Sequence, residues 1–370
     1  MQSQKDAQLE LLQRMVEIYS PTGQESEIAG LLVEQMTKRG LSARIDEAGN
    51  AIGEWGKGPV FLLCGHMDTV PGDLPIRIDG NKLFGRGAVD AKPALAAMLS
   101  AAEMLITEEF PAKLIVVGAV DEEGNSGGIK YLLEREINVN YAVFGEPSGV
   151  DNITIAYKGS LHLKFTCRTE GGHSSSPWLS RSAVEEALDV WRELQTIHFP
   201  EEKPESKFHS LTSALKEIHG GISSSTIPSY CELHTDFRLP PAVSAERLLI
   251  KTKEIVETLV SNHEGVQIQV EVEDSNEPYE ADPDSLLVRG LSWAMRDILK
   301  KPATLLRKTG TGDMNLFGVA QKVPVVTYGP GDSRLDHTSM ENINFDEYRN
   351  SIKILRQGLK RTLQLHNRMV

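Results

Sequence analysis

Two histidines and several carboxylates follow runs of apolar residues, and side chains of these types could bind metal ions. His66 and Asp68 stand in GHMDTVPG, directly after the apolar run VFLLC. Residues two apart in an extended segment face the same side, so Asp68 could accept the hydrogen bond from the second imidazole nitrogen of a metal-binding His66. The alternative is a surface loop in which the two residues have no joint role.

Further acidic side chains repeat this placement. Asp90 follows the glycine-rich segment LFGRGAV, Asp121, Glu122 and Glu123 follow KLIVVGAV, and Glu146 follows YAVFG. Each also has a plain structural explanation, namely a helix N-cap for Asp90 and a solvated turn for the acidic run. Adjacent carboxylates nevertheless repel one another and destabilise the fold unless a cation or hydrogen bonds compensate.

The last candidate is His337 in SRLDHT, which follows the apolar stretch 323–327 and a Gly-Pro-Gly turn. All these candidates lie at predicted strand ends or in the loops after them, and the carboxyl ends of parallel strands share one edge of a sheet. Imidazole and carboxylate without thiolate suit zinc, with cobalt or manganese as substitutes. Two histidines and three carboxylates can hold two ions if one carboxylate bridges, and a sixth group then handles protons. This pattern is that of a two-metal hydrolase site.

The elements around these residues indicate the fold. Residues 60–64, 113–120 and 141–144 are short runs that are apolar on both faces, and a strong helix pattern at 92–107 lies between the first two. Helix patterns also cover residues 9–19 and 25–39. Fully apolar strands separated by helices predict an α/β domain, a mostly parallel sheet with helices on both faces.

The middle of the chain has a different pattern. Residues 160–169 and 230–239 alternate between polar and apolar, which indicates half-exposed antiparallel strands. Residues 182–197 and 245–262 read as amphipathic helices, and the earlier helix–strand pattern returns from about residue 286 to a final helix at 346–366. We therefore expect a catalytic domain formed by residues 1–158 and 275–370, interrupted by an inserted α+β domain at 159–274.

Composition excludes several classes of protein. The 370 residues suit about two domains, and the hydrophobic content of 40% excludes wholesale disorder. With 52 acidic and 39 basic residues the net charge is −13, which argues against partners such as nucleic acid or an anionic membrane. Cys64, Cys167 and Cys231 form neither a disulfide framework nor a zinc finger, and favour a reducing, cytoplasmic location. No apolar run approaches the roughly 20 residues that span a bilayer.

The motifs together resemble one family. GHMDTVPG, GRGAVDAK, DEEGNSGG, GEPS, GGHSSSP and SRLDHT occur in the order found in the zinc-dependent aminoacylase and peptidase family. This family includes acetylornithine deacetylase, succinyl-diaminopimelate desuccinylase and carboxypeptidase G, and the resemblance spans nearly the whole chain. It implies a zinc-peptidase type catalytic domain, an inserted lid domain through which the chain forms a homodimer, and two zinc ions per subunit, with cobalt as a substitute.

The resemblance also implies which residues bind the metal ions. His66 and Glu146 would hold one zinc ion, Glu123 and His337 would hold the other, and Asp90 would bridge them.

Roles in catalysis follow from the same resemblance. Asp68 would orient His66, and Glu122 would be the general base that takes the proton of the attacking water and passes it to the leaving amine. His173, in the lid motif GGHSSSP, would reach the partner subunit's site and stabilise the oxyanion, although it could equally be a satisfied loop histidine.

Residues that could bind the substrate carry weaker signals. Arg238 in TDFRLP matches a lid arginine that binds the substrate carboxylate in relatives, and could equally form a structural ion pair. Thr311 in TGTGD matches a loop of the same pocket. Arg334 either binds a substrate carboxylate or braces Asp336.

We therefore expect a dinuclear zinc amidohydrolase that removes the acyl group from a small-molecule N-acyl amino acid. GRGAVDAK, TGTGDMN and YGPGDSRLDHT are most similar to the acetyl-lysine and acetylornithine deacetylase branch, in lysine and arginine biosynthesis. That branch includes enzymes that release lysine or ornithine from an amino-group carrier protein. The alternative is a zinc dipeptidase or carboxypeptidase with the same metal site. A silent binding module or a structural oligomer would leave the ligands and the base unexplained.

Overall fold

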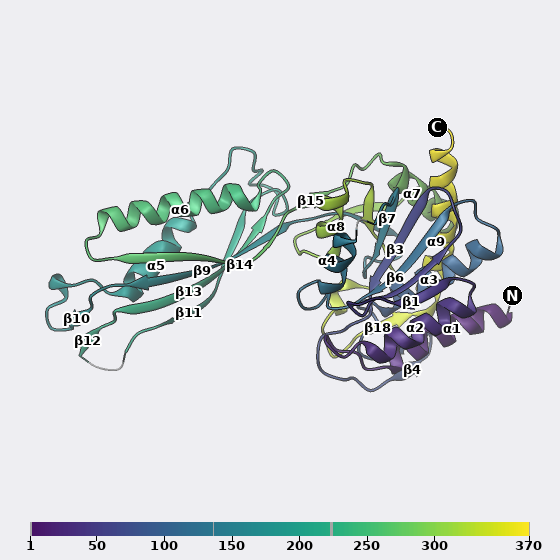
Figure 1. Ribbon diagram of the computed structural model, residues 1–370, viewed down its shortest axis with the longest axis horizontal. Helices are drawn as coiled ribbons and strands as arrows, with labels where there is room; N and C mark the ends of the chain where they lie inside the picture. The colour runs from purple at the N-terminus through teal and green to yellow at the C-terminus, as the bar shows by residue number, and fades with distance from the viewer. Residues whose placement is uncertain (1, 136, 223–224, 370) are drawn as a thin grey trace. The chain divides into compact units, whose positions relative to one another are not determined.

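The chain divides into two compact units in the computed structural model, which describes residues 2–135, 137–222 and 225–369 (Figure 1). The first unit comprises Met1–Ala156, Ala281–Arg307 and Gly312–Val370. The second comprises Tyr157–Glu280 together with the short segment Lys308–Thr311.

The first unit is built around a mixed sheet with the strand order β1-β2-β6-β3-β7-β17-β8, in which β16 also pairs with β8. The strands, in that order, are Ser42–Ile45, Ala51–Trp55, Lys113–Ala119, Val60–His66, Tyr141–Gly145, Val325–Thr327 and Asn152–Tyr157, and β16 is Thr304–Lys308. The four middle strands β6, β3, β7 and β17 are parallel to one another. On either side of them, β2 pairs with β6 and β8 pairs with β17 in antiparallel orientation.

The parallel strands are buried because they are apolar on both faces. Every residue of β3 from Phe61 onward and every residue of β6 from Leu114 onward is buried, as is the whole of β7. A strand with no polar face needs cover on both sides, which a parallel sheet with flanking helices provides. The predicted α/β fold with its mostly parallel sheet is thereby confirmed.

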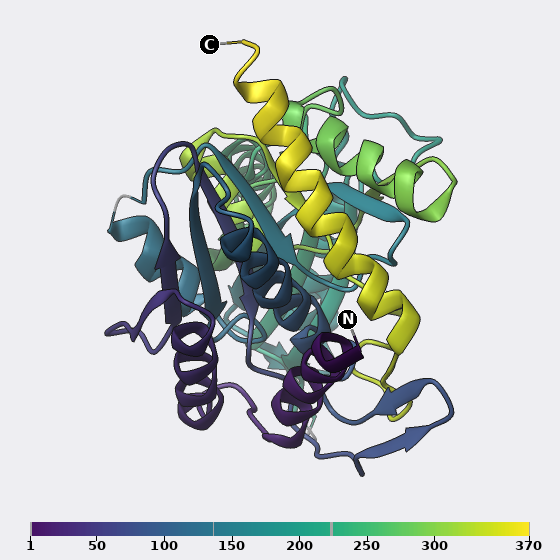
Figure 2. The same cartoon turned by 90° about the vertical axis from the view of Figure 1, so that its right-hand side faces the viewer.

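Helices of the first unit pack on this sheet and on one another (Figure 2). They are α1 (Gln2–Glu17), α2 (Ser26–Lys38), α3 (Lys92–Thr107), α4 (Gly127–Glu134), α7 (Leu286–Leu299), α8 (Asp313–Gln321) and α9 (Phe345–His366). Helix α3 lies against β3 and β6 and also contacts α1 and α9, while α8 contacts α4 and β17. Helix α9 starts where the side chain of Asn344 accepts hydrogen bonds from the Asp346 and Glu347 amides, as an N-cap residue does.

The first unit also contains a small three-stranded sheet. It consists of β18 (Asn342–Asn344), β5 (Lys82–Phe84) and β4 (Arg77–Asp79), in that order. Asn342 pairs with Phe84 in antiparallel register, so the segment after His337 runs beside the segment before Asp90. A short 3-10 helix, η2 (Ser333–Leu335), precedes His337.

The second unit is an antiparallel sheet covered by two helices. The strand order is β11 (Thr212–Gly220), β13 (Tyr230–Leu239), β9 (Gly159–Arg168) and β14 (Gln267–Asn276). Alternate residues of β13 are buried, and they pack with α5 (Ala183–Leu194) and α6 (Ala245–Asn262) in one core. The half-exposed strand expected at residues 230–239 is confirmed, whereas β9 alternates only around Leu161–Phe165 and is otherwise mostly buried. Short elements β10 (Gly172–His173), η1 (Pro177–Leu179) and β12 (Thr226–Ile227) complete the unit.

The three cysteines are buried free thiols. Burial, followed by the neighbouring Cys231, raises the pKa of Cys167 to about 12. Among the residues that the structure describes, no helix is both long enough and apolar enough to cross a membrane.

Candidate metal centre

The site residues of the first unit stand where neighbouring parallel strands end. Strand β3 ends at His66, β6 is followed by the turn that holds Glu122 and Glu123, and β7 is followed by Glu146. Since β6, β3 and β7 are adjacent and parallel, their carboxyl ends meet at one edge of the sheet. The strands thus bring together side chains that are up to 80 residues apart in the sequence.

His66 is buried and its two ring nitrogens have different surroundings. Nδ1 lies 2.9 Å from the backbone oxygen of Asp68 and 3.5 Å from its carboxylate. Nε2 lies 3.2 Å from Oδ1 of Asp90 and 3.8 Å from Oε2 of Glu146. A hydrogen bond at Nδ1 leaves Nε2 available as the metal-binding atom, which is the usual arrangement of a histidine ligand. Burial acts to lower the pKa of His66, but the nearby carboxylates outweigh it and raise this pKa well above its ordinary value.

His337 approaches the same aspartate from another segment of the chain. Its Nε2 lies 3.1 Å from Oδ2 of Asp90 and 3.0 Å from Oε1 of Glu123. The hydrogen bond to Asp90 is the largest of the effects that raise the pKa of His337 to about 9. His337 is half-exposed and has a φ of 61°. This is a left-handed backbone conformation that residues other than glycine seldom adopt.

Asp90 therefore stands between the two histidines, with one carboxylate oxygen toward each. Burial works against its ionisation, but the hydrogen bonds to His337 and His66 hold the pKa of Asp90 well below its ordinary value. An ionised carboxylate that offers one oxygen to each of two ligand sets has the form of a bridging ligand. Glu146 lies 3.8 Å from Nε2 of His66, and Glu123 lies 3.0 Å from Nε2 of His337.

Asp68 forms hydrogen bonds with the turn that follows β6. Its carboxylate accepts hydrogen bonds from the backbone amides of Glu122 at 3.2 Å and Glu123 at 3.1 Å, and from the Thr22 hydroxyl at 2.8 Å. Although burial opposes it, the hydrogen bond to His66 keeps the pKa of Asp68 below its ordinary value. Asp68 thus contacts both the histidine and the turn, and fixes their relative positions.

The carboxylates raise each other's pKa, which shows that negative charge is concentrated in the site. Burial, and then the charge of Glu146, raises the pKa of Glu122 well above its ordinary value. Burial, and then the charge of Asp90, raises the pKa of Glu123. Ligand atoms of His66, Glu122 and Glu146 lie within 4.8 Å of one another, and so do those of His66, Asp90 and Glu123. The donor set and the excess negative charge both fit divalent cations.

Asp313, in the loop TGTGD, is a further acidic residue of the site. It is 4% exposed, and its Oδ1 is a buried atom without a hydrogen-bond partner among the described residues. Burial is the main reason that the pKa of Asp313 is raised to about 7. Helix α8 begins here beside the base candidate, because a Cβ built on Gly312 would lie 3.6 Å from Oε1 of Glu122. The sequence signal at this position is the glycine-rich segment TGTGD, in which Thr311 is the residue expected to bind substrate.

Arg334 lies on η2 and has an exposed side chain. Its guanidinium pairs with the Asp332 carboxylate, at 2.6 Å between Nη2 and Oδ2.

The remaining candidates belong to the second unit. His173 is on β10, and its Nδ1 accepts hydrogen bonds from the Ser175 amide at 3.2 Å and from the Ser175 hydroxyl at 2.8 Å. Arg238, on β13, forms an ion pair with Asp236 at 2.9 Å. Thr311 is the last residue of the segment Lys308–Thr311. The structure places these residues within their unit only.

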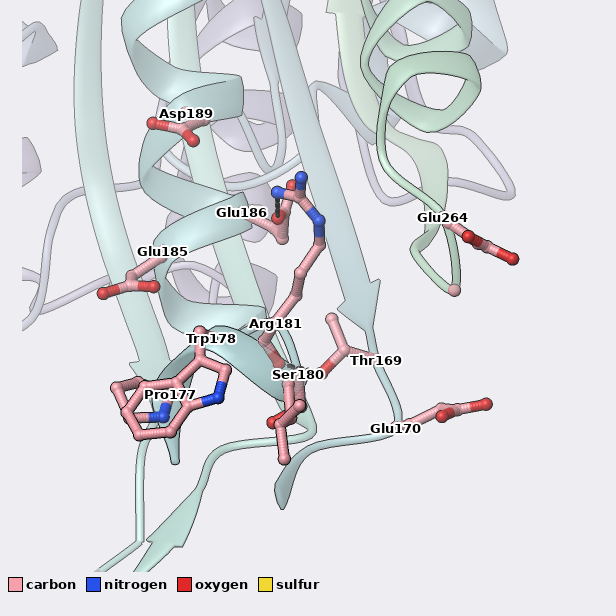
Figure 3. A pocket seen from close by; sticks show the side chains of 12 residues that line it. Thr169, Glu170, Pro177, Trp178, Ser180, Arg181, Glu185, Glu186, Asp189 and Glu264 are labelled. Carbon is pink, nitrogen blue, oxygen red and sulfur yellow. Dashed lines mark hydrogen bonds and ion pairs between the residues drawn. The ribbon is translucent and has the colours of Figure 1, made fainter. Parts of the chain in front are cut away.

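A polar pocket of about 550 Å³ also lies in the second unit (Figure 3). It is lined by acidic side chains such as Glu170, Glu185 and Glu264, with Trp178 at one side. Arg181 points along α5 and pairs with Glu186 at 2.8 Å. None of the candidate site residues lines this pocket.

Comparison with known proteins agrees with this geometry. The family model described as Peptidase family M20/M25/M40 matches residues 62–361. A Deinococcus radiodurans protein named LysW-lysine hydrolase is 34% identical, covering 95% of this chain and 96% of its own. A Sulfurisphaera tokodaii protein named LysW-lysine/LysW-ornithine hydrolase is 33% identical, covering 91% and 90%.

Solved structures share the fold. The crystal structure of aminopeptidase PepT from Bacillus cereus has a TM-score of 0.82 at 20% sequence identity, covering 97% of this chain and 99% of its own. The family match covers most of the chain and includes every residue of the metal centre described above. The chain therefore belongs to Peptidase family M20/M25/M40, whose members are hydrolases of amide bonds.

Proposed function

We propose that the chain is a two-metal amidohydrolase that releases lysine or ornithine from an amino-group carrier protein, in lysine and arginine biosynthesis. The observation that carries the reaction class is the position of Asp90, with Oδ1 3.2 Å from His66 and Oδ2 3.1 Å from His337. A single carboxylate that faces two histidines provides the bridge that two adjacent metal ions require.

The residues fit two divalent ions, which we propose to be zinc, with cobalt as a substitute. His66 and Glu146 would hold one ion, Glu123 and His337 the other, and Asp90 both. Imidazole and carboxylate donors without thiolate are consistent with either metal. When bound, such ions lower the pKa of water and polarise the carbonyl of the scissile amide.

Glu122 is the residue that we assign to proton transfer. Its pKa is raised by burial and by the neighbouring Glu146 carboxylate, so it has the basicity to accept the proton of the attacking water. The protonated carboxyl then delivers this proton to the leaving amine. Asp68 supports the step by holding the amides of Glu122 and Glu123, and it fixes the orientation of His66.

The names of the relatives support the choice of substrate. The Deinococcus and Sulfurisphaera proteins are named as hydrolases of LysW-linked lysine or ornithine, and the chain covers at least nine-tenths of each. A Thermococcus kodakarensis protein with a provisional name of the same kind is 40% identical over 95% of this chain and 90% of its own. We therefore place the carrier-linked amino acid before free N-acetyl-lysine and N-acetylornithine.

Several further assignments are part of the same proposal. Residues 159–274 form a lid through which two chains dimerise, and His173 stabilises the oxyanion in the partner subunit. Arg238, Thr311 and Arg334 bind the substrate. The three buried free thiols support a cytoplasmic location.

A panel of substrates tests the function. Purified protein is assayed with carrier-linked lysine, carrier-linked ornithine, the two free acetyl amino acids and a set of dipeptides, with zinc and cobalt added in turn. The proposal expects carrier-linked lysine or ornithine to give the highest kcat/KM. A higher kcat/KM for the free acetyl compounds would make N-acetyl-lysine or N-acetylornithine the substrate. A higher kcat/KM for dipeptides would favour a dipeptidase with the same metal site.

A further inference from the structure

A buried ion pair joins the segment before Asp90 to the segment after His337. Nη1 of Arg86 donates to Oε1 of Glu341 at 2.5 Å, and the backbone amide of Gly87 donates to Oε2 of the same carboxylate at 2.7 Å. Glu341 is 1% exposed and Arg86 is 8% exposed, so the pair is shielded from solvent. Both oxygens of Glu341 are thus used to hold the glycine-rich segment that leads to Asp90.

Arg86 has two further contacts, which involve two other loops. Its Nε donates to the backbone oxygen of Gly72 at 2.8 Å, in the loop that follows His66. Its Nη1 also lies 3.4 Å from the backbone oxygen of Thr338, the residue directly after His337. Arg86 therefore links its own segment, which leads to Asp90, with the loop after His66 and with the segment after His337.

The position of His337 depends on contacts with neighbouring segments. It is half-exposed, and its left-handed backbone conformation is one that persists only where the surrounding structure enforces it. The hydrogen bond from Gly85 to the Glu341 backbone oxygen, at 3.4 Å, is continued by the pairing of β18 with β5. His66, in contrast, is the last residue of β3, which β6 and β7 pair with on both sides.

We propose that Arg86 and Glu341 are positioning residues that set the distance between His337 and Asp90, and thereby control metal affinity at the position formed by Glu123 and His337. This inference rests on the proposed metal site. Residues that orient metal ligands from behind typically change affinity by about 10–100-fold when they are replaced. Because His66 is held by the sheet, the position formed by His66 and Glu146 should change much less.

The variants Glu341→Gln and Arg86→Lys test this inference. The glutamine keeps the shape of Glu341 but removes its charge, and the lysine keeps the charge of Arg86 but cannot contact Gly72, Thr338 and Glu341 with one planar fork. Glu103→Gln is the control for the loss of an ion pair away from the site. It breaks the ion pair of Arg39 and Glu103 in the same unit, in which the arginine side chain is 9% exposed, as is that of Arg86.

The experiment is a calorimetric titration of the metal-free full-length proteins with Co²⁺, with thermal unfolding followed in parallel. We expect two binding events in the unaltered protein and in Glu103→Gln. In both test variants, one event should weaken by about 10–100-fold while the other stays within a few-fold. Glu341→Asp, which keeps the charge, replaces Glu341→Gln if the latter does not fold, and should shift affinity in the same direction.

Three results would overturn the inference, and they can be told apart. Unchanged affinities in the test variants would show that the ion pair does not position the ligands. Equal weakening of both events, or the same weakening in Glu103→Gln, would show a general loss of stability. Absence of Co²⁺ binding by the unaltered protein would contradict the proposed function itself, and the inference would fall with it.

Discussion

The Nδ1 atom of His66 lies 2.9 Å from the backbone oxygen of Asp68, and the Asp68 carboxylate is 3.5 Å from the same nitrogen. His66 is the last residue of β3, and Asp68 follows two residues later. Asp68 has a second task, because its carboxylate accepts the amides of Glu122 and Glu123. The histidine and the proton-transfer turn therefore share one support.

Replacement of Asp68 by asparagine tests this double task. One carboxylate oxygen becomes an NH₂ group, which cannot accept a hydrogen bond from the Glu122 or Glu123 amide. A buried donor left without its partner costs about 1–3 kcal/mol, so we expect the free energy of unfolding to fall by that amount. We also expect kcat to fall by about 10–100-fold. Thr22→Val is the control, since it removes one hydrogen bond to Asp68 and leaves both amides held; equal kcat in the two variants would refute the double role.

The base assignment predicts the behaviour of Glu122→Gln. The amide keeps the shape of the side chain but cannot accept a proton at neutral pH. We expect kcat to fall by about 10²–10⁴-fold while the metal content and the circular dichroism spectrum stay unchanged. Glu134→Gln, at an exposed position of α4, should leave kcat unaltered. Retained activity in Glu122→Gln would remove this residue from the mechanism.

The proposed cross-subunit role of His173 predicts complementation. A mixture of His173→Ala and Glu122→Gln chains would contain hybrid dimers with one site that has both residues and one that has neither. We expect exchange of subunits to restore measurable activity from two inactive variants. If both His173→Ala and Glu122→Gln are inactive and verified hybrid dimers recover nothing, the two residues do not act across the subunit boundary.

The carboxylates and histidines of the site predict that the stability of the metal-free protein falls as the pH rises. The pKa of Asp313 is raised from 3.8 to about 7, so the stabilisation linked to its proton is complete below pH 3.8 and is lost as the pH passes 7. The pKa of His337 is raised from 6.5 to about 9, so its contribution is lost between those values.

Thermal unfolding of the metal-free protein between pH 5 and pH 9 measures this effect. We expect Tm to decrease over this range, and Asp313→Asn to flatten the part of the curve below pH 7. Added Co²⁺ should raise Tm most at high pH, because it compensates the carboxylates once they are ionised. A Tm that rises from pH 6 to pH 9 without metal would contradict the assigned pKa shifts.

Much of the fold could be predicted from the sequence, because the main elements have strong local patterns. The run 113–120 is apolar on both faces and becomes a central strand, and Pro93 marks the start of α3 at Lys92–Thr107. The alternation in Tyr230–Leu239 likewise predicts a half-exposed strand. Each of these patterns depends on burial over a few consecutive residues, which a sequence shows directly.

The features that could not be predicted from the sequence depend on contacts between distant segments. Arg86 and Glu341 are 255 residues apart, and neither residue has a local signal that would pair it with the other. Asp313 is buried because α8 starts beside Glu122, and this contact depends on how the helix packs. The segment Lys308–Thr311 belongs to the second unit although its flanking residues belong to the first. Such relationships arise only once the chain has folded.

Metal content measured together with activity tests the central claim most directly. The protein, purified without chelator, is analysed by mass spectrometry for bound metals and assayed for release of lysine from the carrier, before and after dialysis against a chelator. We predict two zinc or cobalt ions per chain, loss of activity on chelation and recovery when either metal is returned. A protein that holds no divalent metal and keeps full activity in the presence of the chelator would contradict the account.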